Sequence, residues 1–87
     1  MNKVIRFTSK TCQPCKVLAP IFEDLSKQFS SNAVFQTIDI DENKEMAIKY
    51  NVSAVPTIVI EKNGKEVQRH IGVKPKATYI SNLSAIL

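Results

Sequence analysis

Histidine, cysteine and tryptophan are scarce in this sequence, which contains one His, two Cys and no Trp among 87 residues. A structural metal site takes about four ligands, and Cys12, Cys15 and His70 do not reach that number. The scarcity argues against a structural metal centre, and we expect a protein that uses no bound cofactor. Delivery of a metal ion held by Cys12 and Cys15 alone remains an alternative function.

Long apolar runs and blocks of like charge are also missing. No segment approaches the roughly 18 apolar residues of a membrane span, and residues 1–7 lack the apolar stretch of a signal peptide. The net charge is +4, with lysines scattered along the chain, which gives little support to nucleic-acid binding. We therefore expect a cytoplasmic monomer that binds neither membranes nor nucleic acids.

The remaining composition is typical of one globular domain. Hydrophobic residues make up 44% and charged residues 23% of the chain, which are ordinary values for a folded protein. A chain of this length buries one modest core, and no internal repeat divides it. We expect residues 1–87 to form a single domain.

Hydrophobic periodicity and turn residues predict an α/β fold with the element order βαβαββα. Strands are predicted over residues 3–7, 33–39, 57–60 and 66–71. Val55 and Pro56 lead into the third of these strands. Helices are predicted from the cysteine pair to about residue 29, after Asp41 or Asn43, and from Pro75 onward. A parallel first strand pair and an Asn63-Gly64 hairpin give a four-stranded mixed sheet flanked by three helices.

The two cysteines form a Cys12-Gln13-Pro14-Cys15 motif where the first predicted helix begins. This spacing suits the Cα separation of roughly 4.4–6.8 Å that a disulfide needs. Unpaired N–H groups and the helix dipole should lower the pKa of the Cys12 thiol, whereas core-facing Cys15 should be shielded and have a higher pKa. Cys12 is therefore the predicted nucleophile on a substrate disulfide, and Cys15 the thiol that resolves the mixed disulfide.

A purely structural disulfide is the main alternative interpretation of this motif. Such a bond would close a loop of only four residues and would constrain the unfolded chain little. In the cytoplasm it would also tend to be reduced. Redox catalysis is the favoured interpretation.

Several separated motifs make the sequence resemble the thioredoxin family. They are Phe7, Cys12-x-Pro14-Cys15-Lys16, Ala19-Pro20, Ile40-Asp41, Val55-Pro56-Thr57, Lys62-Asn63-Gly64 and Gly72. The resemblance implies the thioredoxin fold, a cis Pro56 beside the cysteines, and a Val55 that hydrogen-bonds the substrate backbone. It also implies a substrate site made of Thr11, Gln13, Pro14, Val55, Pro56 and Gly72.

The resemblance also implies partners. Disulfide-containing proteins would be the substrates, with ribonucleotide reductase as one possible client, and a reductase such as thioredoxin reductase would donate electrons. A glutathione-dependent, glutaredoxin-like reductase is the first alternative, although Gly72 is followed by Val73-Lys74-Pro75-Lys76 without the Asp of a glutathione site. A non-catalytic binding module with the same fold is the second.

The sequence departs from the thioredoxin pattern around the cysteines. Thr8 and Thr11 stand where thioredoxins usually have Trp, and Arg6 and Thr37 stand where a buried Asp and its Lys partner are expected. Arg6 would lower the pKa of Cys15 if it reached that thiol. The favoured alternative is that its head extends to solvent or pairs with a carboxylate.

Four other residues receive predictions from the sequence. Lys16 either adds positive potential near Cys12 or simply covers the helix surface. Asp41 is better explained as a helix cap, a role for which Asn43 is the alternative, than as a metal ligand, and Tyr79 is assigned to core packing. His70, on the fourth strand, is expected at the surface.

Overall fold

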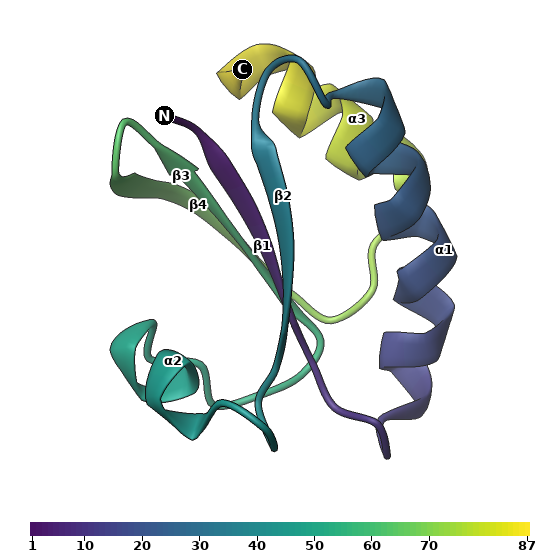
Figure 1. Cartoon of the computed structure of the whole chain (residues 1–87). Helices are drawn as coiled ribbons and strands as arrows, with labels where there is room; N and C mark the ends of the chain where they lie inside the picture. Colours follow the sequence, from purple (N-terminus) through teal and green to yellow (C-terminus); the bar gives the residue numbers. More distant parts are fainter.

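A computed structural model describes residues 1–87 and shows a single four-stranded sheet between two layers of helices (Figure 1). The elements are β1 Lys3–Thr8, α1 Gln13–Gln28, β2 Val34–Asp39, α2 Lys44–Lys49, β3 Thr57–Lys62, β4 Lys65–Ile71 and α3 Lys76–Ile86. This order confirms the βαβαββα prediction. Helices α1 and α3 cover one face of the sheet, and the short α2 lies against the other.

The strand order β2-β1-β3-β4 places the most apolar strands in the middle of the sheet. Strand β1 pairs in parallel with β2 and antiparallel with β3, and β3 pairs antiparallel with β4. Asn63 and Gly64 both have positive φ angles, 54° and 83°, as the hairpin turn between β3 and β4 requires. The mixed sheet predicted from the sequence is confirmed.

Alternation along the strands divides the core into two clusters. Val4 of β1 and Ile58 of β3 face α1 and α3, whereas Ile5 and Phe7 point to the opposite face with Val59. Successive side chains of a strand point to opposite faces, so β1 contributes to both clusters. Its last residues lead directly into the loop that carries the cysteines.

Two sequence predictions outside the cysteine region are decided by the structure. Of the two predicted caps of α2, Asn43 is the one observed, and its side-chain oxygen accepts a hydrogen bond from the Met46 N–H at 3.3 Å. His70 is 8% exposed rather than at the surface, because α3 covers that face of β4. Its ring stacks edge-to-face on Tyr79 with centroids 5.2 Å apart.

Candidate functional site

The two cysteines form a disulfide at the N-terminus of α1. Their Cα atoms are 5.2 Å apart, within the range that a disulfide accommodates. Cys12 is the helix N-cap, and the backbone N–H of Cys15 points at its sulfur with an N···Sγ distance of 3.2 Å. Cys12 is half-buried and Cys15 is 2% exposed, so the outer sulfur is the one that a partner can reach.

The helix begins where its residues favour a helix start. Gln13 and Pro14 occupy the first turn and are exposed, and Pro14 loses nothing there because the first N–H groups of a helix have no partner within it. Cys15, Leu18, Phe22 and Leu25 are the buried residues of α1. Their spacing buries Cys15 against the sheet and leaves Cys12 at the edge of the molecule.

The loop before Cys12 is held by a buried serine that sequence reasoning missed. Ser9 is 9% exposed, and its hydroxyl donates to the Asp41 carboxylate at 2.6 Å. The Ser9 carbonyl accepts the N–H of Cys12 at 3.3 Å. The predicted parallel pairing of the first two strands could have indicated this contact. The carboxyl ends of β1 and β2 meet at one edge of the sheet, and Ser9 and Asp41 follow those two ends.

The loop before β3 lies beside the cysteines, where the family resemblance placed it. The Val55–Pro56 peptide bond is cis, as predicted, and the Val55 carbonyl oxygen lies 3.7 Å from the sulfur of Cys12. The Thr57 hydroxyl donates to the Ala54 carbonyl at 2.7 Å, and this hydrogen bond spans the two ends of the Val55–Pro56 segment. Val55 and Pro56 thus lie next to Cys12, near the start of α1.

Gly72 is hydrogen-bonded to Pro56 through the backbone. Its N–H donates to the Pro56 carbonyl at 2.8 Å, and its φ of 85° lies in the left-handed region that glycine tolerates. Tyr79 is 2% exposed, which agrees with its predicted packing role. Its hydroxyl also accepts the Lys74 N–H at 2.9 Å, and it lies 3.4 Å from the Gly72 carbonyl. Burial raises the pKa of Tyr79, so the hydroxyl stays protonated and able to donate.

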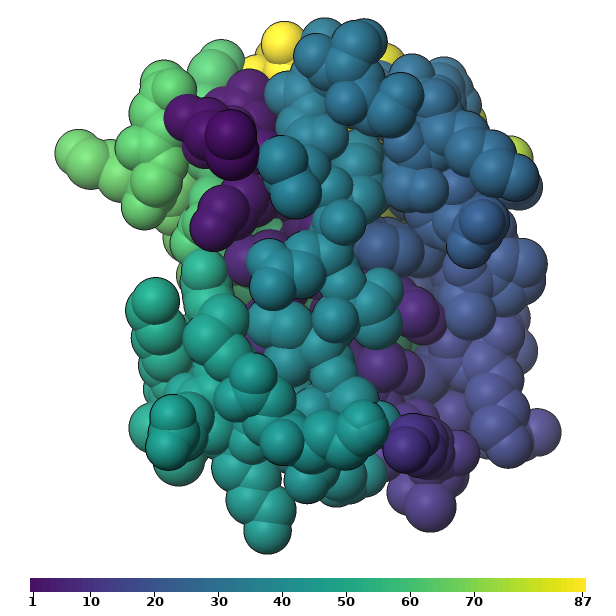
Figure 2. Space-filling view, in the orientation of Figure 1, coloured from purple at the N-terminus to yellow at the C-terminus, as the bar shows by residue number.

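A hollow of about 260 Å³ opens beside Cys15. Its walls are Arg6, Thr8, Ser9, Lys10, Cys15, Lys16, Ala19 and Asp39. In the space-filling view, atoms of the N-terminal segment (purple) show between β2 (teal) and α1 (blue) (Figure 2). The structure therefore brings both proposed pKa modulators, Arg6 and Lys16, to the buried cysteine.

Arg6 forms no ion pair, so the carboxylate alternative for its head is not observed, while its partial exposure agrees with the solvent alternative. Its guanidinium donates to the Thr37 hydroxyl from Nε at 3.4 Å and from Nη2 at 3.3 Å. Its Cζ atom lies 5.2 Å from the centre of the Phe22 ring. Burial lowers the pKa of Arg6, and the more distant charge of Glu23 partly offsets this effect.

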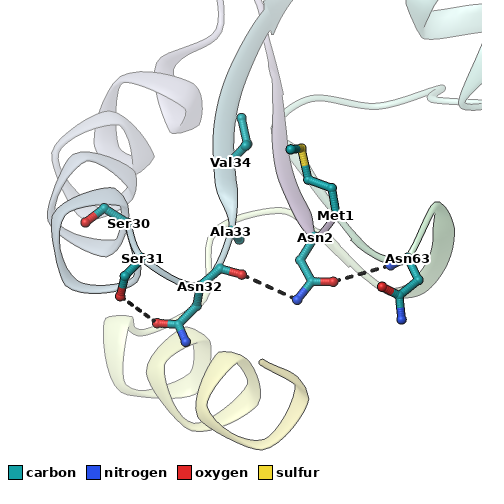
Figure 3. A pocket seen from close by; sticks show the side chains of 8 residues that line it. All are labelled: Met1, Asn2, Ser30, Ser31, Asn32, Ala33, Val34 and Asn63. Carbon is teal, nitrogen blue, oxygen red and sulfur yellow. Dashed lines mark hydrogen bonds between the residues drawn. The ribbon is translucent and has the colours of Figure 1, made fainter.

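A second hollow, of about 390 Å³, lies at the other end of the sheet (Figure 3). Its lining is mostly amide and hydroxyl side chains, among them Asn2, which bonds the Asn32 carbonyl and the Asn63 N–H. This hollow contains no thiol and no ionisable side chain. No group of three or more His, Cys, Asp or Glu side chains could hold a metal ion, and no helix is both long and apolar enough to span a bilayer.

A disulfide at a helix N-terminus, beside a cis-proline loop on a βαβαββα sheet, is the arrangement of a thiol-disulfide oxidoreductase. The thioredoxin family model matches residues 1–85. The chain therefore belongs to the thioredoxin family, whose members carry redox equivalents in their own cysteine pair.

Individual relatives agree with this assignment. Thioredoxin H4 of Arabidopsis thaliana is 45% identical over 69 residues, which are 79% of this chain and 58% of that protein. Thioredoxin of Staphylococcus epidermidis is 35% identical over 85 residues, covering 98% of this chain and 78% of the relative. The crystal structure of Fasciola hepatica thioredoxin superposes with a TM-score of 0.88 at 36% identity, over 97% of this chain and 79% of that one.

Proposed function

We propose that this chain acts as one unit over residues 1–87 and reduces disulfides in other proteins, with Cys12 as nucleophile and Cys15 as resolving thiol. The supporting observation is the N-cap position of Cys12, whose sulfur receives the Cys15 N–H at 3.2 Å. In the reduced protein the same N–H stabilises a thiolate, because charge-assisted hydrogen bonds favour the charged form.

The reaction takes place in two exchange steps. The Cys12 thiolate attacks one sulfur of the substrate disulfide, an S–S bond forms between Cys12 and the substrate, and the other substrate sulfur leaves as a thiolate that water protonates. Cys15 then loses its proton and attacks the sulfur of Cys12. The Cys12–Cys15 bond forms, the mixed disulfide breaks, and the second substrate sulfur leaves as a thiolate with the electron pair of the broken bond and is protonated by water.

Substrate backbone binds beside Val55 in this proposal. Because Val55 precedes β3 and its carbonyl oxygen lies 3.7 Å from the Cys12 sulfur, an extended substrate segment can pair with this loop as a short added strand. In this proposal Pro56 and Gly72 lie beneath the bound substrate segment. The exposed residues Thr11, Gln13 and Pro14 contact the segment from the side of the α1 N-terminus.

Partners follow from the same chemistry. A second protein must return two electrons to the Cys12–Cys15 disulfide after each cycle, and we propose thioredoxin reductase as that donor. Ribonucleotide reductase is a candidate substrate, and the chain works as a monomer in the cytoplasm, where a lone Cys-x-x-Cys motif is more often catalytic than structural.

The experiment compares disulfide reduction by wild type, Cys12→Ser and Cys15→Ser, with a chemical dithiol as electron donor. Cys12→Ser should lose activity to background, because no thiolate remains at the exposed position. Cys15→Ser should accumulate a mixed disulfide with the substrate, visible as added mass on the protein. A Ser84→Cys change in the Cys12→Ser protein is the matched control, since it restores an exposed thiol on α3, away from the α1 N-terminus.

Two results would contradict the proposal. Rescue by Ser84→Cys would show that any exposed thiol suffices, and full activity in Cys12→Ser would make the cysteine chemistry incidental, as in a binding module. The electron donor is tested separately by NADPH consumption. We expect turnover with thioredoxin reductase and little with glutathione and glutathione reductase.

A further inference from the structure

Positive charge dominates the hollow beside Cys15. Arg6, Lys10 and Lys16 line it together with a single carboxylate, Asp39. Lys10 is already neutralised in part, because it pairs with Glu42 at 3.4 Å. The net charge of this lining therefore favours an anion in the hollow.

Arg6 is the cation whose position in this hollow is set by the strand that carries it. It follows Val4 by two residues on β1, so both side chains point to the face that α1 covers. Its head lies near the Phe22 ring and donates to Thr37, its neighbour in register on β2. The half-buried guanidinium is held by a neutral hydroxyl and forms no ion pair with a carboxylate, which leaves it free to face an anion.

The anion that needs this charge forms during the redox cycle. The oxidised cysteine pair carries no charge. When the disulfide opens, the Cys15 sulfur can become a thiolate at a residue that is only 2% exposed. A thiolate at a site with so little water is costly unless a positive group faces it. Cys15 and Arg6 line the same hollow, and a guanidinium keeps its proton at all working pH values.

We propose that Arg6 is a positioning residue that stabilises the Cys15 thiolate and thereby speeds release of the substrate from its mixed disulfide with Cys12. The inference rests on the proposed function. In this step the Cys15 proton leaves through the hollow to water, and the thiolate displaces the substrate sulfur from Cys12. The electron pair of the broken bond departs with the substrate, while Arg6 exchanges neither a proton nor an electron.

Other charged groups around Cys15 act in known directions. Lys16 of α1 acts in the same direction as Arg6 but is exposed and strongly hydrated, so its effect is weaker. Asp39, at the end of β2, opposes the thiolate, and Glu23, one helical turn beyond Ala19, weakens the field of Arg6. Arg6 is the cation of this lining that is both half-buried and without a carboxylate partner.

The first test titrates Cys15 by itself, in the Cys12→Ser protein, through the ultraviolet absorbance of its thiolate. Arg6→Met removes the charge and keeps an apolar stem over Phe22. It should move the midpoint to higher pH by about one unit, the lower end of the effect of a neighbouring opposite charge. Arg6→Lys should move it less, and Lys65→Gln, which removes a charge from the distant hairpin, should leave it unchanged.

The second test follows resolution of a preformed mixed disulfide between Cys12 and a substrate peptide in a single turnover. With Arg6→Met the rate should fall about three- to fourfold at neutral pH, because a midpoint shift of about one unit leaves about tenfold less thiolate but makes each thiolate about threefold more nucleophilic. The rate should recover at high pH, where Cys15 is fully ionised. A structural defect would lower the rate at every pH. If Arg6→Met does not fold, Thr37→Val replaces it, since loss of the anchoring hydroxyl should shift the Cys15 midpoint upward by less.

Distinct results separate this inference from the proposed function. If wild type reduces disulfides and the Cys15 midpoint is the same in wild type and Arg6→Met, the role of Arg6 is refuted and the function stands. An equal shift with Lys65→Gln also refutes it, because the effect would then be that of net charge. If wild type forms no mixed disulfide through Cys12, the proposed function itself fails.

Discussion

The two faces of the sheet are held by different forces. On the α1 and α3 face, nine buried residues form one apolar cluster, with Leu25, Phe22 and Leu83 among them. On the α2 face only four buried residues form the cluster, and α2 itself buries no residue completely. Burial of apolar surface is the dominant stabilising force in folding, so the first face carries most of the stability.

Polar contacts take a larger share on the α2 face. Arg69 of β4 donates to the Tyr50 carbonyl at 2.6 Å and to the Asn51 carbonyl at 3.2 Å, where α2 ends. It also forms two hydrogen bonds of 2.8 Å with the Glu66 carboxylate. The comparison teaches that one face packs a large apolar cluster under α1, the helix that carries Cys15, while the other holds α2 by a smaller apolar cluster together with the contacts of one guanidinium.

Leu25→Ala should produce the largest effect and so test the apolar face. Leu25 is 1% exposed, and buried Leu to Ala changes typically cost about 3–5 kcal/mol of unfolding free energy. Met46→Ala on half-buried α2 is the matched change and should cost about 1 kcal/mol. Denaturant titration of both variants measures the difference, and equal losses would contradict the proposed asymmetry of the faces.

Arg69→Gln tests the polar contacts of the α2 face. We expect a loss of about 1–2 kcal/mol in unfolding free energy, because hydrogen bonds to charged groups contribute about this much at partly exposed sites. Arg69→Lys keeps the charge but not the planar fork, and should recover less than half of the loss. If both variants unfold at the wild-type denaturant concentration, the guanidinium contacts do not hold α2.

Protonation of His70 should have the smallest effect on the free energy of unfolding, and it should appear as a dependence of stability on pH. Burial between β4 and α3, with a lesser contribution from the charge of Lys74, lowers its pKa in the folded state. The unfolded chain, with a His pKa of about 6.5, therefore binds the proton more tightly. Stability is full above about pH 6.5 and falls as the pH drops toward the lowered folded pKa.

Denaturant midpoints measured across this pH range check that sign. His70→Gln should remove the slope below about pH 6.5, because it keeps a polar side chain near Asn82 without a titrating ring. Identical slopes in both proteins would assign the pH dependence to other groups.

Local signals explain which parts of the fold could be predicted. The Asn63-Gly64 turn, the apolar β3 run and the Cys12-to-Cys15 helix start depend on residues close in sequence, and each is confirmed. The Val55–Pro56 geometry is also confirmed, through the family resemblance. The burial of His70 was missed because β4 alone does not show which of its faces α3 covers.

The sequence by itself determined the element order, the hairpin and the cysteine pair, since periodicity, turn chemistry and helix-start preferences act over a few residues. Only the tertiary structure decided the contacts between distant segments. The parallel register of β1 and β2 brings Ser9 to Asp41 and Arg6 to Thr37. Side chains more than 30 positions apart meet there because strands pair along their full length, which no local pattern specifies.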